Sequence, residues 1–454
     1  MSLEVTVAGV RFRSPIGLAP IGGSSHFGAR DPDEDRELQV ALDYVLKNVE
    51  AGSNHVCVNV SYIRPDTLRK LLDSCGGVAR PAPPKPRAER FLRVTSGRPP
   101  YGLEGLYSAV SPGPCTPDPA IEDALFAFQK RFVEAIKQRR PDGVPIIGAV
   151  IGCGGLPNAY VDAARKCEEL GVDLIEINFH CPLQAGQRNE VDWALSGWFP
   201  AVSHGGLVAE HPRLVGEITR AVASAVSLPV GAKFSAEAGF PRIVELARQV
   251  RDAGGRYVHV GGAGVGIAPP DIYNGGRPLW SFVDGNPFCL TSGAWMRRVC
   301  YRDVAAVARF VPELDIMASG GLVQPEHCVE AMMLGAKVTE ICAGVLEQGR
   351  SLLRRANEFL RRFLTEQGYT EARALVGLAQ PYIKYAEELD MWAGQVVSVL
   401  NQEKCTQCGQ CLEGLCIAIS EKDGRIVIDT DRCTGCGACT LVCPAAAYNL
   451  ELRR

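Results

Sequence analysis

The chain has 454 residues, more than one ordinary hydrophobic core holds, so we expect a large domain and a smaller one. Hydrophobic residues make up 46% and charged residues 22% of a chain whose formal net charge is -3, a balance that argues against nucleic acid as a partner. The sequence shows no signal-peptide pattern at its start and no apolar run that would span a bilayer, so we expect a cytoplasmic protein with no membrane partner.

Short apolar runs rich in β-branched residues recur along the larger part of the chain. They lie at 15–20, 55–60, 145–152, 172–179, 228–234, 256–262, 314–321 and 337–344. Amphipathic stretches typical of helices lie between most of them, at 35–51, 159–170, 212–225 and 241–253. Buried parallel strands read as continuous apolar runs, so this alternation predicts a (β/α)8 TIM barrel of the α/β class, with a doubly wound open sheet as the alternative.

The chemistry of a barrel is expected at the C-terminal ends of its strands. The seventh and eighth runs end in Ser319-Gly320-Gly321 and Cys342-Ala343-Gly344, and glycines there let backbone N–H groups approach a phosphate, although any one glycine is more often a turn residue. Lys233 lies in the fifth run, where a lysine needs an anionic or polar partner, and a plain salt bridge would also explain it. No G-x-G-x-x-G follows a first strand, so the chain is not expected to bind a dinucleotide itself.

Near the end of the chain, cysteines gather in two arrays. The first is Cys405, Cys408, Cys411 and Cys416, and the second is Cys433, Cys436, Cys439 and Cys443 followed by Pro444. The second array has the spacing of two-cluster bacterial ferredoxins, in which the fourth cysteine serves the other cluster. The arrays therefore predict two [4Fe–4S] clusters: Cys405, Cys408, Cys411 and Cys443 would hold one, and Cys433, Cys436, Cys439 and Cys416 the other. Structural zinc and a disulfide scaffold are the alternatives, and runs of three cysteines disfavour zinc.

Several motifs, in order along the chain, together resemble the dihydroorotate dehydrogenase-like flavoprotein family. Within it the closest likeness is to the flavin- and ferredoxin-containing catalytic part of dihydropyrimidine dehydrogenase, of the bacterial NAD-dependent type. The motifs are Gly17-Leu18-Ala19-Pro20, Asn178 with Cys181-Pro182, Gly231-Ala232-Lys233, Ser292-Gly293, Ala318-Ser319-Gly320-Gly321 and Cys342-Ala343-Gly344.

This resemblance implies FMN in the barrel mouth, with Lys233 facing the N1–C2=O region of the ring and glycines holding the phosphate. The residues implied for the flavin are Ala19, Pro20, Asn59, Asn178, Lys233, Gly261, Gly262, Ser292, Gly293, Gly320, Gly321, Ala343 and Gly344. A flavin turns a hydride step into single electrons that clusters carry. The family likeness also implies a partner subunit that binds FAD and NAD(P)H, or a ferredoxin.

The family's proton-transfer residue is missing. Its loop cysteine or serine is absent from Gly206-Leu207-Val208-Ala209-Glu210-His211-Pro212, and His180 stands where the family has a serine. The catalytic candidates are therefore His204, which lies on the same loop, together with His180 and Asn178, because histidine suits acid–base work near neutral pH. We attribute Glu210 to the dipole of the next helix, His259 to the core and Cys181 to a structural role. The aromatic residues of 192–206 either stack on a planar substrate or only close over the flavin, and the long segment 75–119 covers the site or contacts a partner.

These observations predict a flavin barrel domain at 1–365, a helical linker at 366–400 and a ferredoxin-like domain at 401–454. The function that we predict is an oligomeric oxidoreductase for a small molecule with a carbon–carbon bond conjugated to a carbonyl, with electrons relayed through the clusters to or from the partner. The alternatives are an NAD(P)H-dependent dihydropyrimidine dehydrogenase catalytic subunit and an electron-transfer subunit without a substrate of its own.

Overall fold

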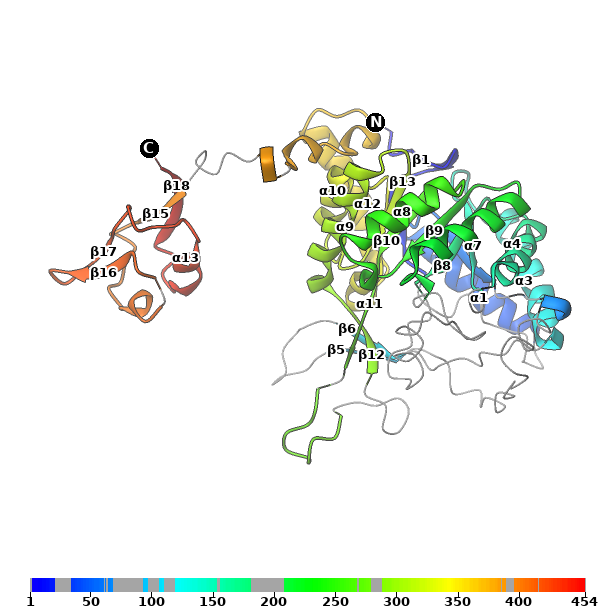
Figure 1. Cartoon of the computed structure of the whole chain (residues 1–454), viewed down its shortest axis with the longest axis horizontal. Coiled ribbons are helices and arrows are strands. Elements are labelled where there is room, and N and C mark those ends of the chain that lie inside the picture. Colours follow the sequence, from blue (N-terminus) through cyan, green and yellow to red (C-terminus); the bar gives the residue numbers. More distant parts are fainter. Residues whose placement is uncertain are drawn as a thin grey trace. The chain divides into compact units, whose positions relative to one another are not determined.

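The computed structural model describes residues 2–20, 34–60, 62, 64–67, 93–96, 106–109, 119–152, 156–180, 208–267, 269–278, 288–384, 386–388, 396–414 and 416–453. The chain divides into two compact units, residues 1–382 and 383–454 (Figure 1). No helix within the described ranges is long and apolar enough to cross a membrane.

A parallel eight-stranded sheet forms the centre of the first unit. Its hydrogen-bonded order is β3-β14-β13-β10-β9-β8-β7-β4. The strands are β3 (Ile16–Leu18), β4 (Val56–Val60), β7 (Ile146–Val150), β8 (Leu174–Phe179), β9 (Val230–Phe234), β10 (Tyr257–Gly261), β13 (Asp315–Ser319) and β14 (Val338–Ile341). Each lies within one of the predicted apolar runs. This order follows the chain around the sheet, as a barrel requires.

The two end strands of this sheet, β3 and β4, meet through side chains of the segment just before β4. The backbone N–H of Leu18 donates to Oγ of Ser53 at 3.0 Å, and Nδ2 of Asn54 donates to the carbonyl oxygen of Ser14 at 2.7 Å. A Cβ on Gly17 would lie 2.3 Å from Oδ1 of Asn54, so only glycine lets β3 come this close. The sheet therefore curls back on itself, which confirms the predicted TIM barrel and excludes the open sheet.

Helices cover the outside of the strands (Figure 1). They are α1 (Glu34–Glu50), α3 (Pro119–Arg139), α4 (Pro157–Leu170), α7 (Pro212–Ala225), α8 (Arg242–Asp252), α9 (Arg297–Phe310), α10 (Pro325–Leu334), α11 (Ala343–Gln348) and α12 (Ser351–Glu366). Proline at the first turn begins α4, α7 and α10, where its missing N–H has no helical partner to lose. The four predicted helices correspond to α1, α4, α7 and α8, and each is confirmed to within two residues at both ends.

An N-terminal hairpin closes one end of the barrel. It consists of β1 (Val5–Val7) and β2 (Val10–Phe12), and its apolar side chains form one buried cluster with side chains from the strands. The cluster members are Val5, Val7, Phe12, Ile147, Leu174, Tyr257, Met317 and Val338. These strand residues lie near the N-terminal ends of their strands, so the hairpin forms the floor and the mouth is at the other end.

A second, antiparallel sheet, of order β11-β12-β6-β5, consists of β11 (Gly264–Ile267), β12 (Phe288–Ser292), β6 (Leu106–Ala109) and β5 (Arg93–Ser96).

In its described residues the second unit contains two small antiparallel pairs, a short α-helix and 3-10 turns. β15 (Val396–Leu400) pairs with β18 (Tyr448–Leu452), β16 (Ile419–Lys422) pairs with β17 (Arg425–Ile428), and α13 (Ala438–Val442) contains Cys439 of the second array. The prediction of a helical linker at 366–400 is wrong for most of its described part, which contains short 3-10 turns and then strand β15. The sequence VVSVL explains the strand, because branched side chains favour an extended backbone.

Candidate functional site

Glycines with a left-handed backbone gather at the C-terminal ends of the barrel strands. Gly261 (φ 91°) ends β10, and Gly321 (φ 77°) follows β13. A Cβ would lie 1.9 Å from the carbonyl oxygen of Ser319 at the first and 2.2 Å from the backbone nitrogen of Arg297 at the second, so neither position tolerates a side chain. Gly262, Gly293 and Gly320 also have positive φ. The glycines thus let the segments that follow β10 and β13 pack closely against their neighbours at the mouth, and a glycine-rich backbone of this kind is compatible with a phosphate site.

The other residues predicted to bind the flavin lie at the same end of the barrel. Asn178 on β8 stands opposite Lys233 on β9 in the strand register, and the two side chains are 8% and 7% exposed. Asn59 lies on β4, and Ala19 and Pro20 follow β3. Ser292 ends β12, and Ala343 and Gly344 begin α11 directly after β14. The bare backbone and the ring of polar side chains together fit FMN, a molecule with a phosphate at one end and a polar-edged ring at the other.

His180 is held in place as a hydrogen-bond acceptor. Its Nε2 accepts from the backbone N–H of Ala263 at 3.2 Å, and its own backbone N–H donates to Oδ1 of Asn178 at 3.0 Å. Burial, assisted by the positive charge of Lys233 and by His259, lowers the pKa of His180 to about 3. The ring is therefore neutral near pH 7, and its proton is on Nδ1. A ring with so low a pKa is poorly suited to proton exchange near pH 7.

Below the mouth the barrel interior contains charged side chains. His259 is fully buried, with Nδ1 3.0 Å from Oε2 of Glu176 and Nε2 3.0 Å from Oγ of Ser319. This confirms that His259 is a satisfied core histidine. Lys233 has the anionic partner that its position in an apolar strand predicts, because its Nζ lies 3.9 Å from Oε2 of Glu340.

Sequence reasoning missed the two buried glutamates. Glu176 and Glu340 are 2% and 1% exposed, and each is the acidic residue of an otherwise apolar or neutral strand. A single carboxylate in such a strand is the signal that would have found them, since a buried charge needs a partner.

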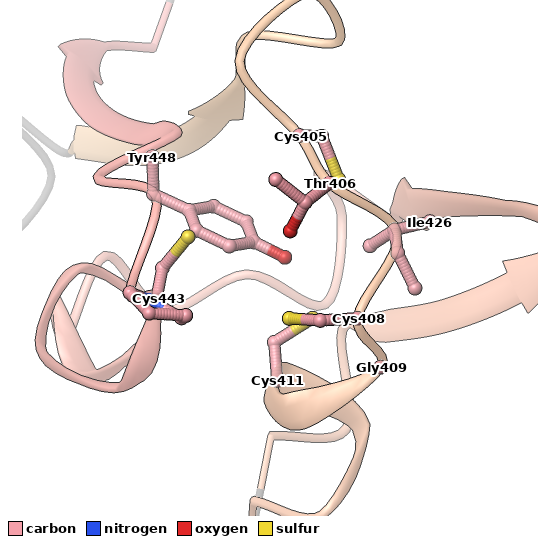
Figure 2. A pocket seen from close by; sticks show the side chains of 9 residues that line it. Cys405, Thr406, Cys408, Gly409, Cys411, Ile426, Cys443 and Tyr448 are labelled. Atoms are coloured by element: carbon pink, nitrogen blue, oxygen red, sulfur yellow. The ribbon is translucent and has the colours of Figure 1, made fainter.

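The cysteines of the first predicted cluster line one cavity. Figure 2 shows Cys405, Cys408, Cys411 and Cys443 around a common space, with the nearly buried ring of Tyr448 beside them. These four come from two stretches of chain more than 30 residues apart, as the ferredoxin pattern requires of the fourth ligand. Their convergence on one cavity fits the four-cysteine ligand set predicted for this cluster.

The cysteines of the second predicted cluster lie beside strand β15. The backbone N–H of Ser398 donates to Sγ of Cys433 at 3.3 Å, and its hydroxyl lies 2.9 Å from Sγ of Cys439. Cys436 is exposed and Cys416 is half-buried. Hydrogen bonds of this kind are ordinary neighbours of iron–sulfur ligands.

Other sequence predictions fall near the mouth or outside the described residues. Glu210 forms an ion pair with Arg242, which accounts for it better than a helix dipole does, and His211 is the residue before α7. His204, Cys181 and the segment 192–206 lie outside the described residues, as does most of 75–119.

Two family models match parts of the chain. Residues 148–264, from β7 to the start of β11, match the dihydrouridine synthase (Dus) family, and residues 424–445 match a 4Fe-4S binding domain.

Curated relatives extend the likeness over more of the chain. The NAD-dependent dihydropyrimidine dehydrogenase subunit PreA of Escherichia coli (strain K12) is 27% identical over 296 residues, 64% of this chain and 65% of the relative. The chain thus spans slightly less than two thirds of that protein. The catalytic subunit of dihydroorotate dehydrogenase B (NAD(+)) of Pyrococcus abyssi is 25% identical over 69% of this chain and 91% of the relative. A putative dihydroorotate dehydrogenase A (fumarate) of Aeropyrum pernix is 29% identical over 52% of this chain and 68% of the relative.

These similarities agree with the barrel, the glycine-lined mouth and the cysteine cavity. They confirm the predicted resemblance: the chain is similar to a dihydropyrimidine dehydrogenase subunit and to the catalytic subunit of a dihydroorotate dehydrogenase, and its residues 424–445 match a 4Fe-4S binding domain.

Proposed function

We propose that the chain is an oxidoreductase that binds FMN in the barrel mouth and two [4Fe–4S] clusters in the second unit. Its substrate would be a small molecule with a carbon–carbon bond conjugated to a carbonyl. The observation that carries this proposal is the combination, at one end of one barrel, of a side-chain-free backbone cradle with Asn178, Lys233 and His180. The cavity lined by cysteines in the same chain supports an iron–sulfur cluster, which would accept single electrons from FMN.

The residues of the mouth would divide the work of holding the flavin. Gly293, Gly320, Gly321, Ala343 and Gly344 would surround the phosphate with backbone. Ala19, Pro20, Asn59, Gly261, Gly262 and Ser292 would line the remaining contacts, with Asn178 and Lys233 beside the polar edge of the ring. When bound, FMN supplies hydride exchange with the substrate and one-electron exchange with the clusters.

His180 and Asn178 would orient the substrate. With Nε2 held by the N–H of Ala263, the neutral ring of His180 has a fixed orientation and would help to shape the substrate site without exchanging a proton. A different group must then move the proton at the neighbouring carbon. We propose His204 for that step, because it lies on the loop that carries the catalytic base in the family that the chain resembles.

The two clusters would connect FMN with a second protein. The proposed ligand sets are those predicted above, with Cys405, Cys408, Cys411 and Cys443 on one cluster and Cys433, Cys436, Cys439 and Cys416 on the other. The names of the relatives support a partner subunit that binds FAD and NAD(P)H, since one is a subunit of an NAD-dependent enzyme and another is the catalytic subunit of an NAD(+) enzyme.

A reconstitution experiment tests this function. The chain would be purified anaerobically, and its FMN, iron and acid-labile sulfide measured, followed by reduction with dithionite. Candidate enones and pyrimidines would then be added one at a time. Reoxidation of the flavin by one of them is the expected result, whereas a chain that contains zinc and no sulfide would contradict the cluster assignment.

A dihydropyrimidine is the second candidate substrate, favoured by the similarity to the Escherichia coli dihydropyrimidine dehydrogenase subunit. The missing loop cysteine opposes it. Reoxidation by uracil or thymine, and not by other enones, would favour this narrower function. Reoxidation by no small molecule, but by an electron-transfer protein, would favour a subunit without a substrate of its own.

A further inference from the structure

A cluster of ionisable side chains is buried in the barrel between the floor and the mouth. We call it the interior charge cluster: Glu176, Glu340, Lys233, His55 and His259. All five are at most 8% exposed. Buried charges are costly unless they are paired, so the pairing within this cluster decides which charges persist there.

His55 lies between an amide and Glu340. Its Nδ1 lies 2.6 Å from Oδ1 of Asn54, whose amide nitrogen donates to Ser14, so that Oδ1 is the acceptor and Nδ1 the donor. Its Nε2 lies 3.2 Å from Oε1 of Glu340 but forms no hydrogen bond among the described residues. Glu340 therefore has an imidazole beside one oxygen and Lys233 beside the other.

Glu340 keeps its negative charge, and one of its oxygens lacks a hydrogen bond. Burial alone would raise the pKa of Glu340, but His259, Lys233 and His55 outweigh burial and bring it to about 2. Its Oε2 lies 3.5 Å from Nε2 of His259 and 3.9 Å from Nζ of Lys233. Among the described residues this oxygen has no hydrogen-bond donor. Lys233, which reaches the mouth, therefore has an ionised carboxylate close behind it.

We propose that Glu340 is a positioning residue that sets the reduction potential of FMN through Lys233. The inference rests on the proposed function, since it requires FMN in the mouth. Reduction adds two electrons and one proton to FMN, so the bound ring gains one negative charge. Lys233 favours that charge, and Glu340, which lies 3.9 Å from Nζ of Lys233, opposes it.

Two substitutions with different expected sizes of effect test the proposal. Glu340→Gln removes the negative charge and keeps the size of the side chain, so the midpoint potential of bound FMN should rise. By linkage, reduced FMN should then bind roughly tenfold tighter relative to oxidised FMN than in the wild type. Glu340→Asp keeps the charge but moves it away from Nζ of Lys233, so the potential should rise by a smaller amount. Glu313→Gln makes the same chemical change as Glu340→Gln outside the cluster and should leave the potential unchanged.

The measurements are FMN titration of the apoprotein, circular dichroism for folding and spectroelectrochemistry of the bound flavin. A wild-type chain that binds no FMN would overturn the proposed function and this inference with it. Bound FMN with the same potential in the wild type and in Glu340→Gln would overturn this inference alone. If Glu340→Gln does not fold, Glu340→Asp decides, and an unchanged or lowered potential there would overturn it.

Discussion

Gly262 and His180 share one space in the barrel mouth: a Cβ on residue 262 would lie 2.4 Å from Nε2 of His180. The imidazole fits there only because residue 262 has no side chain. The next residue, Ala263, donates its backbone N–H to the ring and so fixes its orientation. The orientation of the proposed substrate-binding histidine therefore depends on a glycine in another strand's loop.

Gly262→Ala should displace His180 and strain the backbone, because residue 262 has φ 123°. We expect a loss of roughly 1–3 kcal/mol in the free energy of unfolding and a rise in KM. Urea denaturation and steady-state kinetics measure the two effects. Gly275→Ala is the control, since φ there is also positive (64°) but no atom lies within 4 Å of the added Cβ. An unchanged KM in Gly262→Ala would show that His180 does not orient the substrate.

His180 should make the protein less stable as the pH falls from 7 to 5. Its pKa is about 3 in the folded chain, against an ordinary 6.5, so the unfolded chain binds the proton first and stability is lost below pH 6.5. Removal of this group in His180→Gln should reduce the acid-induced loss between pH 7 and pH 5 by up to about 2 kcal/mol. Urea denaturation at both pH values checks this, and an equal loss in both proteins would contradict the lowered pKa.

Cys436→Ala should remove one cluster and leave the flavin bound. The substituted cysteine belongs to the second compact unit, whereas the glycine-lined mouth belongs to the first. Iron should fall from about eight to about four atoms per chain, with FMN content unchanged and electron transfer to an external acceptor lost. Loss of FMN together with the iron would mean that the two units do not fold independently.

His204→Gln should lower turnover by roughly 10²–10⁴-fold, the usual contribution of a positioned acid or base, with FMN and iron retained. Exchange of substrate hydrogen with solvent at the carbon beside the hydride position should stop as well. His211→Gln serves as the matched control on the same stretch of chain. Full turnover and exchange in His204→Gln would leave bound water or Glu210 as the proton carrier.

Much of the barrel follows from the sequence because buried parallel strands are continuous apolar runs with helices between them. The glycines at the strand ends and the partner of Lys233 followed from the same logic. The pairing of His55 with Glu340 did not, since the two come from opposite ends of the sheet and meet only when it closes. The lowered pKa of His180 did not follow either, because the burial that causes it is set by neighbours on other strands. Strand β15 was missed because a five-residue apolar stretch does not by itself distinguish strand from helix.

The junction of β3 and β4 makes one side of the barrel different from the rest. Every other neighbouring pair of barrel strands is joined by a backbone ladder, whereas the described residues at this junction meet through Ser53, Asn54 and Gly17. A wall held by side chains opens at lower cost than one held by a ladder, so the amide of Leu18 should exchange its hydrogen sooner than those of β8 and β9. Because Asn54 also holds His55, each opening would change the contact between His55 and Glu340. Slow motion of the barrel wall would thereby alter the surroundings of the buried carboxylate next to Lys233.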